Sequence, residues 1–251
     1  FERKLVKLVK KIKKVNVLLT GIGGSTPRAI AKCLKKYSKY GEYRIIGTDC
    51  NPFVLGLYEK KYSDKSYLIP SVDSGEYWNV ILAIIKKETI DVAVVQPEEE
   101  VELWAKFLKN NAITCKILLP AYELIVSLRN RELMNNLLAD TNYIPKYFFF
   151  INKDVNLKNV VKKVGYPYWL RSSKGSSGVG SLKINNIEEG RAWLRINSKI
   201  EKFTVSEYLP GRNLTCECLF RNGEIIKAAS AERFRYLMEK AAPSGITGNI
   251  S

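Results

Sequence analysis

The sequence predicts an α/β protein with a Rossmann-like parallel sheet in its first part and an α+β region in its second. Short β-branched runs alternate with helical segments between residues 15 and 120, a pattern typical of parallel strands joined by crossover helices. Beyond residue 121, helices alternate with apolar runs and a hairpin signal, which is typical of antiparallel strands. The length of 251 residues is sufficient for two hydrophobic cores.

The first part begins with a strand at 15–20, which ends in the glycine-rich loop 21–24. Pro27 suits the first turn of the helix that follows, because its fixed backbone angle is compatible with a helix start. A second strand at 44–49 ends at Asp49. The pattern continues with a strand at 67–70, a helix at 74–88, a strand at 91–96, a helix at 98–110 and a strand at 116–120. We therefore expect one doubly wound domain over residues 15–120.

The second part, residues 121–251, opens with a helix that is predicted to run to about residue 139. It continues with a strand at 147–151, a helix at 157–164, a strand at 168–172, a Gly- and Ser-rich loop at 173–181, a helix at 188–196 and strands at 203–209 and 214–221. Asn222 and Gly223 stand between two apolar runs, which is a strong hairpin signal.

The composition excludes several classes of enzyme. The chain has no histidine, which excludes hydrolases that depend on a Ser–His or Cys–His pair and most zinc enzymes. Its five cysteines are scattered without a C-x-x-C pair, so we expect reduced thiols. No apolar run reaches the roughly 18 residues of a membrane-spanning helix, and no secretion signal is visible. A cytoplasmic protein without membrane insertion is expected.

The chain carries 41 basic and 25 acidic residues, a formal net charge of +16, which suggests anionic partners. Part of this excess lies in residues 1–14, where apolar residues recur at helical spacing, so a short basic amphipathic helix is predicted there. We prefer packing or homodimer formation for this helix over contact with nucleic acid or an anionic surface. The remaining charges are spread over helix faces, so nucleic acid is not an expected partner.

The first glycine-rich loop places Gly23 and Gly24 between a strand and a helix, where free N–H groups favour anions. If Asp49 accepted a hydrogen bond from a ribose hydroxyl, this loop could bind a dinucleotide, but the glycine spacing is not G-x-G-x-x-G. We prefer a tight turn that lines a substrate crevice at the carboxyl ends of the strands. The acidic run 98–102 is interpreted as complementing a helix dipole, with substrate binding as the alternative.

The second glycine-rich loop follows a strand that carries Arg171. A cation beside a loop of N–H and hydroxyl donors can bind a polyphosphate. The alternative is a solvent-exposed hairpin with Arg171 on its outer face. The residues downstream favour the first interpretation, because a Glu-Tyr-Leu-Pro-Gly run at 207–211 and a further strand follow.

The order of these motifs resembles the ATP-grasp superfamily, in particular proteins like the large subunit of carbamoyl phosphate synthase. The shared order is a basic residue on a helix, an Ile-Pro step at 144–145, a Gly-Tyr-Pro strand at 165–167 with a cation, a glycine-rich loop, the hinge at 207–211 and a strand pair. The resemblance covers nearly the whole chain. It implies a Rossmann-like pre-ATP-grasp domain over 15–120 and an ATP-grasp domain over 121–251, with a lid at about 141–206.

The resemblance also implies roles for individual residues. ATP-binding residues would be Arg131, Arg129, Arg171, Lys174, Gly175, Ser176, Ser177, Gly178, Glu207, Tyr208, Leu209 and Asn213. The loop from Gly175 to Gly180 would close over the phosphates, and the hinge Glu207, Tyr208 and Leu209 would hold the adenine. Substrate-binding residues would be Gly23, Gly24, Gly245 and Ile246. Glu217 matches an acidic position of the family without a clear role.

The activity that the resemblance implies is ATP-dependent ligation of a carboxylate or bicarbonate to an amine or ammonia through an acyl phosphate, with ATP and Mg²⁺ as cofactors. Asn213 departs from the family, which usually has a Glu there for the ribose. The magnesium ligands of the family would lie beyond Ser251. We therefore expect a fragment truncated at its C-terminus, or, as the alternative, a non-catalytic nucleotide-binding or anion-binding module.

Overall fold

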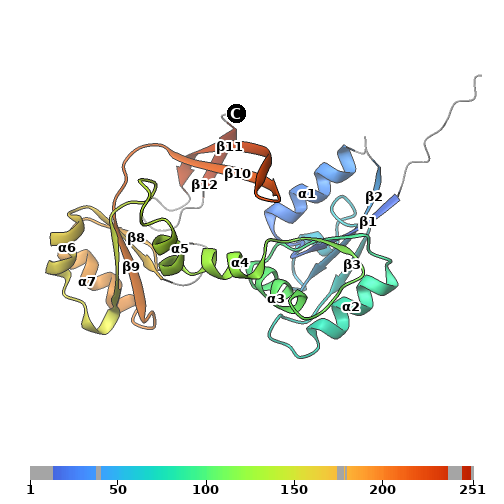
Figure 1. Cartoon of the computed structure of the whole chain (residues 1–251), viewed down its shortest axis with the longest axis horizontal. Helices are drawn as coiled ribbons and strands as arrows, with labels where there is room; N and C mark the ends of the chain where they lie inside the picture. Colours follow the sequence, from blue (N-terminus) through green and yellow to red (C-terminus); the bar gives the residue numbers. More distant parts are fainter. Residues whose placement is uncertain (1–13, 38–40, 174–177, 179, 237–244, 250–251) are drawn as a thin grey trace, which may run out of the picture. The chain divides into compact units, whose positions relative to one another are not determined.

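A computed structural model of the chain describes residues 14–37, 41–173, 178, 180–236 and 245–249 (Figure 1). The chain divides into two compact units, Phe1–Val126 and Ser127–Ser251. None of the helices described is long and apolar enough to cross a membrane. The predicted basic helix at 1–14 lies outside the described residues except for Lys14, which is the first residue of a strand.

The first unit is built on a five-stranded parallel sheet, as predicted (Figure 1). The strands are β1 (Lys14–Thr20), β2 (Glu42–Asp49), β3 (Lys65–Leu68), β4 (Val92–Val94) and β5 (Lys116–Leu118), in the order β3-β2-β1-β4-β5. The helices are α1 (Ser25–Lys36), α2 (Tyr77–Lys87) and α3 (Glu98–Leu108), with a short helical turn at Leu55–Leu57; a further helix, α4 (Tyr122–Arg129), spans the boundary between the two units. From β1 the chain adds β2 and β3 on one side of the sheet and then β4 and β5 on the other. Folds of this type have a crevice at the carboxyl edge of the sheet where the order changes, here between β1 and β4.

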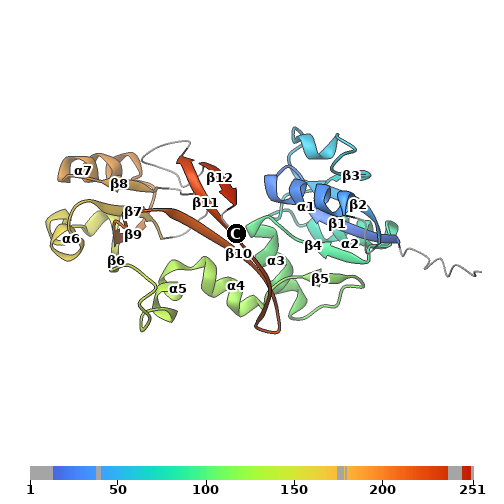
Figure 2. The ribbon, with the colours of Figure 1, turned by 90° about the horizontal axis from the view of Figure 1, so that it is seen from above.

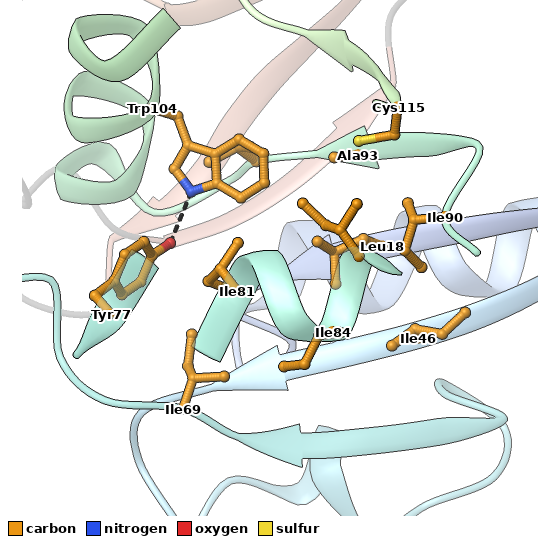
Figure 3. Close-up of a cluster of buried hydrophobic side chains, with 12 residues drawn as sticks. Leu18, Ile46, Ile69, Tyr77, Ile81, Ile84, Ile90, Ala93, Trp104 and Cys115 are labelled. Carbon is orange, nitrogen blue, oxygen red and sulfur yellow. Dashed lines mark hydrogen bonds between the residues drawn. The ribbon is translucent and has the colours of Figure 1, made fainter. Parts of the chain in front are cut away.

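Alternation along the strands explains why helices cover both faces of this sheet. In β1, Leu18 packs into a cluster with residues of α2 and α3, whereas Leu19 packs into a second cluster with Ala31 of α1. Figure 3 shows the first cluster, in which Trp104 donates a hydrogen bond of 2.7 Å from its indole N–H to the Tyr77 hydroxyl. Both rings are almost completely buried. Each such side chain contributes about 1.5–3 kcal/mol by leaving water.

The second unit contains a four-stranded antiparallel sheet and a three-stranded one. The first consists of β6 (Tyr147–Ile151), β7 (Tyr168–Ser172), β8 (Leu182–Ile184) and β9 (Lys202–Glu207), in the order β6-β9-β7-β8 (Figure 2). The second consists of β10 (Asn213–Arg221), β11 (Glu224–Tyr236) and β12 (Gly245–Asn249). The helices are α5 (Arg131–Leu137), α6 (Leu157–Val164) and α7 (Ile187–Ile196), with a helical turn at Asn152–Asp154.

Two predictions for this unit were wrong in detail. The single helix expected over 121–139 is two helices, α4 and α5, because the Asn130 side chain accepts from the N–H groups of Glu132 and Leu133 and so begins a new helix. Strand β8 was not predicted, since its three residues are too short for a visible alternation. The hairpin prediction was right: Asn222 and Gly223 both have positive φ between β10 and β11.

The carboxylate of Glu100 is buried at the carboxyl edge of the parallel sheet. Glu100, in the first turn of α3, accepts a hydrogen bond of 2.6 Å from the Tyr77 hydroxyl and another from Thr20. Burial raises the pKa of the Glu100 carboxyl to about 7. The acidic run at 98–102 therefore includes one residue that belongs to the core, whereas Glu98 and Glu99 are exposed as helix-dipole partners would be.

We expect Glu100→Gln to remove a pH dependence from the stability of the first unit. Because the folded pKa is above the ordinary value of 4.5, wild-type stability falls as pH rises from about 4.5 to 7, by roughly 3 kcal/mol. The variant should therefore gain stability over wild type across this range. Hydrogen exchange of α2 and α3 peptides in urea measures the effect, with exposed Glu99→Gln as the control. Parallel profiles for wild type and Glu100→Gln would contradict the prediction.

Candidate functional site

One face of the sheet β6-β9-β7-β8 carries aromatic and cationic side chains. The other face packs on α6 and α7 through residues such as Tyr168, Leu170 and Phe203. Strand register defines the open face, because residues directly opposite each other share a face. One row across it is Phe149, Thr204 and Arg171, and the next is Tyr147, Ser206, Trp169 and Lys183. This face thus combines rings that can stack on a base with cations that can neutralise phosphates.

Two arginines are close enough to interact electrostatically. Arg171 lies on β7 and is half-buried, and Arg131 is the first residue of α5. Burial and the nearby positive charge of Arg131 lower the pKa of the Arg171 guanidinium to about 10. Both groups stay charged at neutral pH, so they repel each other in an environment that screens charge less than water does. An anion between them would relieve the repulsion.

An ion pair connects the helix that bears Arg131 to the sheet. Lys202 of β9 and Glu132 of α5 form this pair, and the Lys202 ammonium also lies 5.2 Å from the centre of the Phe149 ring. Since Glu132 directly follows Arg131, the pair fixes the first turn of α5 next to the open face. It also neutralises the only side-chain carboxylate adjacent in sequence to Arg131.

The base of the second glycine-rich loop is firmly anchored. Gly178 and Gly180 both have positive φ, and the Gly180 carbonyl accepts a hydrogen bond of 2.9 Å from the Trp193 indole. A Cβ on Gly180 would lie 2.7 Å from Ile200, so only glycine fits. The predicted phosphate-binding residues Lys174, Gly175, Ser176 and Ser177 lie outside the described residues.

The predicted adenine hinge follows β9. The Glu207 carboxylate accepts the Lys146 N–H at 2.8 Å, and the Glu207 N–H donates to the Lys146 carbonyl at 3.0 Å. Glu207 thus fastens the end of β9 to the start of β6. The Lys183 ammonium lies 4.2 Å from the centre of the Tyr208 ring, and Leu209 is exposed. The hinge is therefore fixed on the sheet that bears Arg171.

The other predicted residues lie in several places. Asn213 opens β10, and its side-chain oxygen accepts from Arg233 at 3.1 Å. Gly245 and Ile246 are on β12, paired with Tyr236 and Arg235 of β11. Arg129 is the last residue of α4, one residue before the Asn130 cap. The structure thus brings together Arg131 and Arg171, and it joins Tyr208 to the same sheet through Lys183.

In the first unit, the loop after β1 is closed by contacts with its own chain. The Asp49 carboxylate accepts from the N–H groups of Gly23 and Asn51 at 2.8 and 2.9 Å, so both its oxygens are used. A Cβ on Gly23 would lie 2.5 Å from Val54. The Gly24 N–H donates to the Gly21 carbonyl. Asp49 therefore holds this turn together instead of serving as the ribose ligand of a dinucleotide site.

Several members of the open face were missed by sequence reasoning, namely Phe149, Trp169, Lys183, Lys202 and Thr204. A usable signal existed, because Trp169 and Arg171 alternate with buried residues in β7, as one-face positions do. Within the described part of the chain, no three His, Cys, Asp or Glu residues are grouped to hold a metal ion.

Comparisons with known proteins agree with this architecture. Residues 17–118 match the family model for the N-terminal domain of PylC-like proteins. The chain has no match among curated protein sequences. Among solved structures it is similar to N5-carboxyaminoimidazole synthetase from Staphylococcus aureus in complex with ADP, with a TM-score of 0.65, 14% identity and coverage of 88% of this chain and 55% of that one.

Two further structures show the same likeness. L-amino acid ligase from Bacillus licheniformis matches with a TM-score of 0.64 and 13% identity over 94% of this chain and 56% of that one. The chain also matches the biotin carboxylase domain of the 2-oxoglutarate carboxylase of Hydrogenobacter thermophilus, which was solved as a dimer with MgADP, ADP and bicarbonate. The TM-score is 0.59 and the identity 17%, over 86% of this chain and 49% of that one. The chain spans about half the length of these proteins, and the likeness shows a shared fold.

We expect Arg171→Met to remove the response of the second unit to polyphosphate anions. Replacing a half-buried charge by an apolar side chain of similar length should leave the anion-free stability unchanged or higher. Wild type should gain about 2.7 kcal/mol at tripolyphosphate concentrations 100 times Kd, and the variant should not. Hydrogen exchange of β7 and β9 peptides measures both effects, with exposed Arg221→Met as the control. An equal gain in the variant would place the anion elsewhere.

Proposed function

We propose that this chain, which has the ATP-grasp fold, is the nucleotide-binding part of an ATP-dependent ligase that joins a carboxylate to an amine through an acyl phosphate. The observation that carries the proposal is the Arg131–Arg171 pair beside the aromatic rows of the open sheet face. Two guanidinium groups close to each other can neutralise the charge of phosphate groups and donate hydrogen bonds to their oxygens. Aromatic rings on the same face suit a ligand that has both a base and phosphates.

The described residues fit ATP in three respects. Arg131 and Arg171 would neutralise the phosphates, with Arg forks suited to phosphate oxygens. The rings of Phe149 and Trp169 would lie against the base or ribose. The backbone of Tyr208 and Leu209 would bind the adenine edge, since Glu207 fixes this segment to the sheet.

The chemistry proposed for the whole protein is phosphoryl transfer followed by acyl transfer. A carboxylate oxygen attacks the γ-phosphorus of ATP, and the bond to ADP breaks. The amine nitrogen then attacks the acyl carbon, inorganic phosphate leaves and the amine loses a proton. Arg131 and Arg171 contribute by holding the phosphates in place and balancing their charge. Mg²⁺, when bound, would neutralise negative charge on the phosphates. No group of three possible metal ligands occurs among the described residues, so we assign no residue to hold it and no step to it.

The identity of the two substrates forms the finer part of the proposal. A carboxylate and an amine are the general case, and bicarbonate with ammonia would make the protein like carbamoyl phosphate synthase. The similar structures include an L-amino acid ligase and a bicarbonate complex of a biotin carboxylase domain. The first supports a carboxylate substrate and the second supports bicarbonate. Gly23, Gly24, Gly245 and Ile246 remain proposed substrate contacts. A homodimer and a cytoplasmic location complete the proposal.

ATP binding by the chain is the direct test. Calorimetry with ATP should show one saturable site, and Arg171→Ala or Arg131→Ala should weaken binding about 10- to 100-fold, because each removes a charged hydrogen-bond donor. Arg221→Ala, on the exposed end of β10, is the matched control. NADH should not bind in a fluorescence titration. Absence of saturable heat with wild type would refute the nucleotide site.

The Glu132–Lys202 pair should govern ATP affinity through Arg131. Lys202→Met leaves the Glu132 carboxylate unneutralised beside Arg131, so we expect ATP to bind several-fold more weakly. Adding Glu132→Gln removes that carboxylate and should restore part of the affinity, although the ion pair that fixes α5 is still absent; a double-mutant cycle measures the coupling. The pair Lys109–Glu123 of the first unit provides control variants of the same type. A double variant as weak as Lys202→Met would instead mean that Lys202 itself contacts the phosphates.

A further inference from the structure

A second recessed surface lies on the opposite side of the four-stranded sheet, outside the proposed nucleotide site. It is a groove of about 1100 Å³ between α6 and α7, together with the segment that leads into α6. The two helices lie side by side on the helical side of this sheet (Figure 1). Small-molecule pockets usually measure roughly 300–1,000 Å³, so this groove is larger than a typical ligand of that kind requires.

The groove has an apolar floor that reaches the core. Leu157 of α6 and Leu194 of α7 line it and are buried members of the cluster beneath the sheet. The half-buried side chains of Val155 and Ile187 extend the floor. On α7 the lining positions are 187, 188, 191, 194 and 195, which is the spacing of a single helix face.

The wall of the groove is held in place by hydrogen bonds between asparagine side chains and the backbone. The Asn152 amide donates to the carbonyls of Leu194, Asn197 and Ile200 at 3.2–3.4 Å, which ties the entry to α6 to the end of α7. The Asn156 side chain accepts the Lys158 N–H at 3.0 Å and so caps α6. Both helix borders of the groove are thus fixed before any partner arrives.

The rim is strongly basic. Lys153, Lys158, Arg191 and Arg195 line the groove and are exposed, whereas Glu188 is the one acidic side chain among the lining residues. None of the four cations forms an ion pair with a carboxylate in the portion of the chain that the structure describes. Among the lining residues, the rim therefore has four exposed cations and one carboxylate above an apolar floor.

We propose that this groove is a docking site for an acidic amphipathic helix of another protein. The apolar stripe of such a helix would cover Leu157, Leu194 and Ile187, and its carboxylates would meet the basic rim, in the helix-in-groove manner of recognition. Rim charges of this type guide association and select partners. The site is independent of ATP binding, because it lies on the face of the sheet opposite Arg171.

The lining favours a peptide over a nucleic acid. Single-stranded nucleic acids bind by stacking bases on aromatic side chains along a basic path, and no aromatic side chain is among the lining residues. A small phosphate compound would need a buried charged or polar anchor, whereas all four cations are exposed. An acidic helix uses both the charge and the apolar floor.

The test uses the full chain and a fluorescein-labelled synthetic 18-residue helix with leucines on one face and glutamates on the other. Fluorescence anisotropy should show saturable binding, and Arg191→Glu combined with Arg195→Glu should weaken it more than about tenfold, because the reversed charges repel the peptide. The control is Lys162→Glu with Lys199→Glu, which changes the net charge equally at exposed positions outside the groove lining. This control should bind the peptide with less than about a threefold change.

Further arms separate the alternatives. A peptide with alanines in place of leucines should bind at least several-fold more weakly, because the floor is then unfilled. If the groove variant does not fold, as judged by circular dichroism, Arg191→Gln with Arg195→Gln replaces it, with a smaller loss expected. Equal loss in the groove and control variants, or binding unaffected by the leucine replacement, would reduce the effect to general surface charge and overturn the proposal. Groove-dependent binding of a single-stranded oligonucleotide without binding of the peptide would also overturn it.

Discussion

Two guanidinium groups that repel each other are held together by the fold of the second unit. The register of β7 against β9 places Arg171 opposite Thr204, and the Glu132–Lys202 pair fixes the helix that bears Arg131. Neither element can move away without breaking a strand ladder or an ion pair. The free energy that this arrangement costs is supplied by the core on the other face of the sheet, where Tyr168, Leu170 and Phe203 are fully buried. The site is therefore organised before a ligand binds, which reduces the ordering cost of binding.

The polar groups at the carboxyl edge of the first unit and on the open face of the second unit have different neighbours. At the carboxyl edge of the first unit, Asp49 and Glu100 are satisfied by the chain itself, through Gly23 and Asn51 for Asp49 and through Tyr77 for Glu100. On the open face of the second unit, Arg171 has a like charge as its neighbour. Buried polar groups that find partners within the chain stabilise a fold, whereas two guanidinium groups close to each other are suited to an anionic ligand. This contrast, more than the presence of glycines in both loops, distinguishes the turn after β1 from the proposed phosphate site.

Local patterns allowed most of the architecture to be predicted from the sequence. The parallel sheet was predictable because β-branched runs alternate with helical segments, and the hairpin at Asn222 and Gly223 because both residues tolerate positive φ. The pair of Arg131 and Arg171 was found by resemblance, since the two residues are 40 positions apart in sequence and no local pattern joins them. Glu100 was interpreted only as complementing the helix dipole, because its burial depends on the Tyr77 hydroxyl, which is contributed by another helix. Contacts between distant elements are what the sequence alone could not provide.

The net charge of +16 is best understood through its distribution on the second unit. Cations occur on both sides of one small sheet: Arg171, Lys183 and Lys202 on the open face, and four rim residues above the helices on the other. On the open face the cations stand among aromatic rings and are half-buried, so their fields are weakly screened and suited to phosphates. On the helical side they are fully hydrated and surround an apolar floor, so each contributes little alone and they act together on a large acidic partner. The degree of burial therefore distinguishes the two groups of cations: the half-buried ones are suited to phosphates, and the exposed ones to an acidic partner.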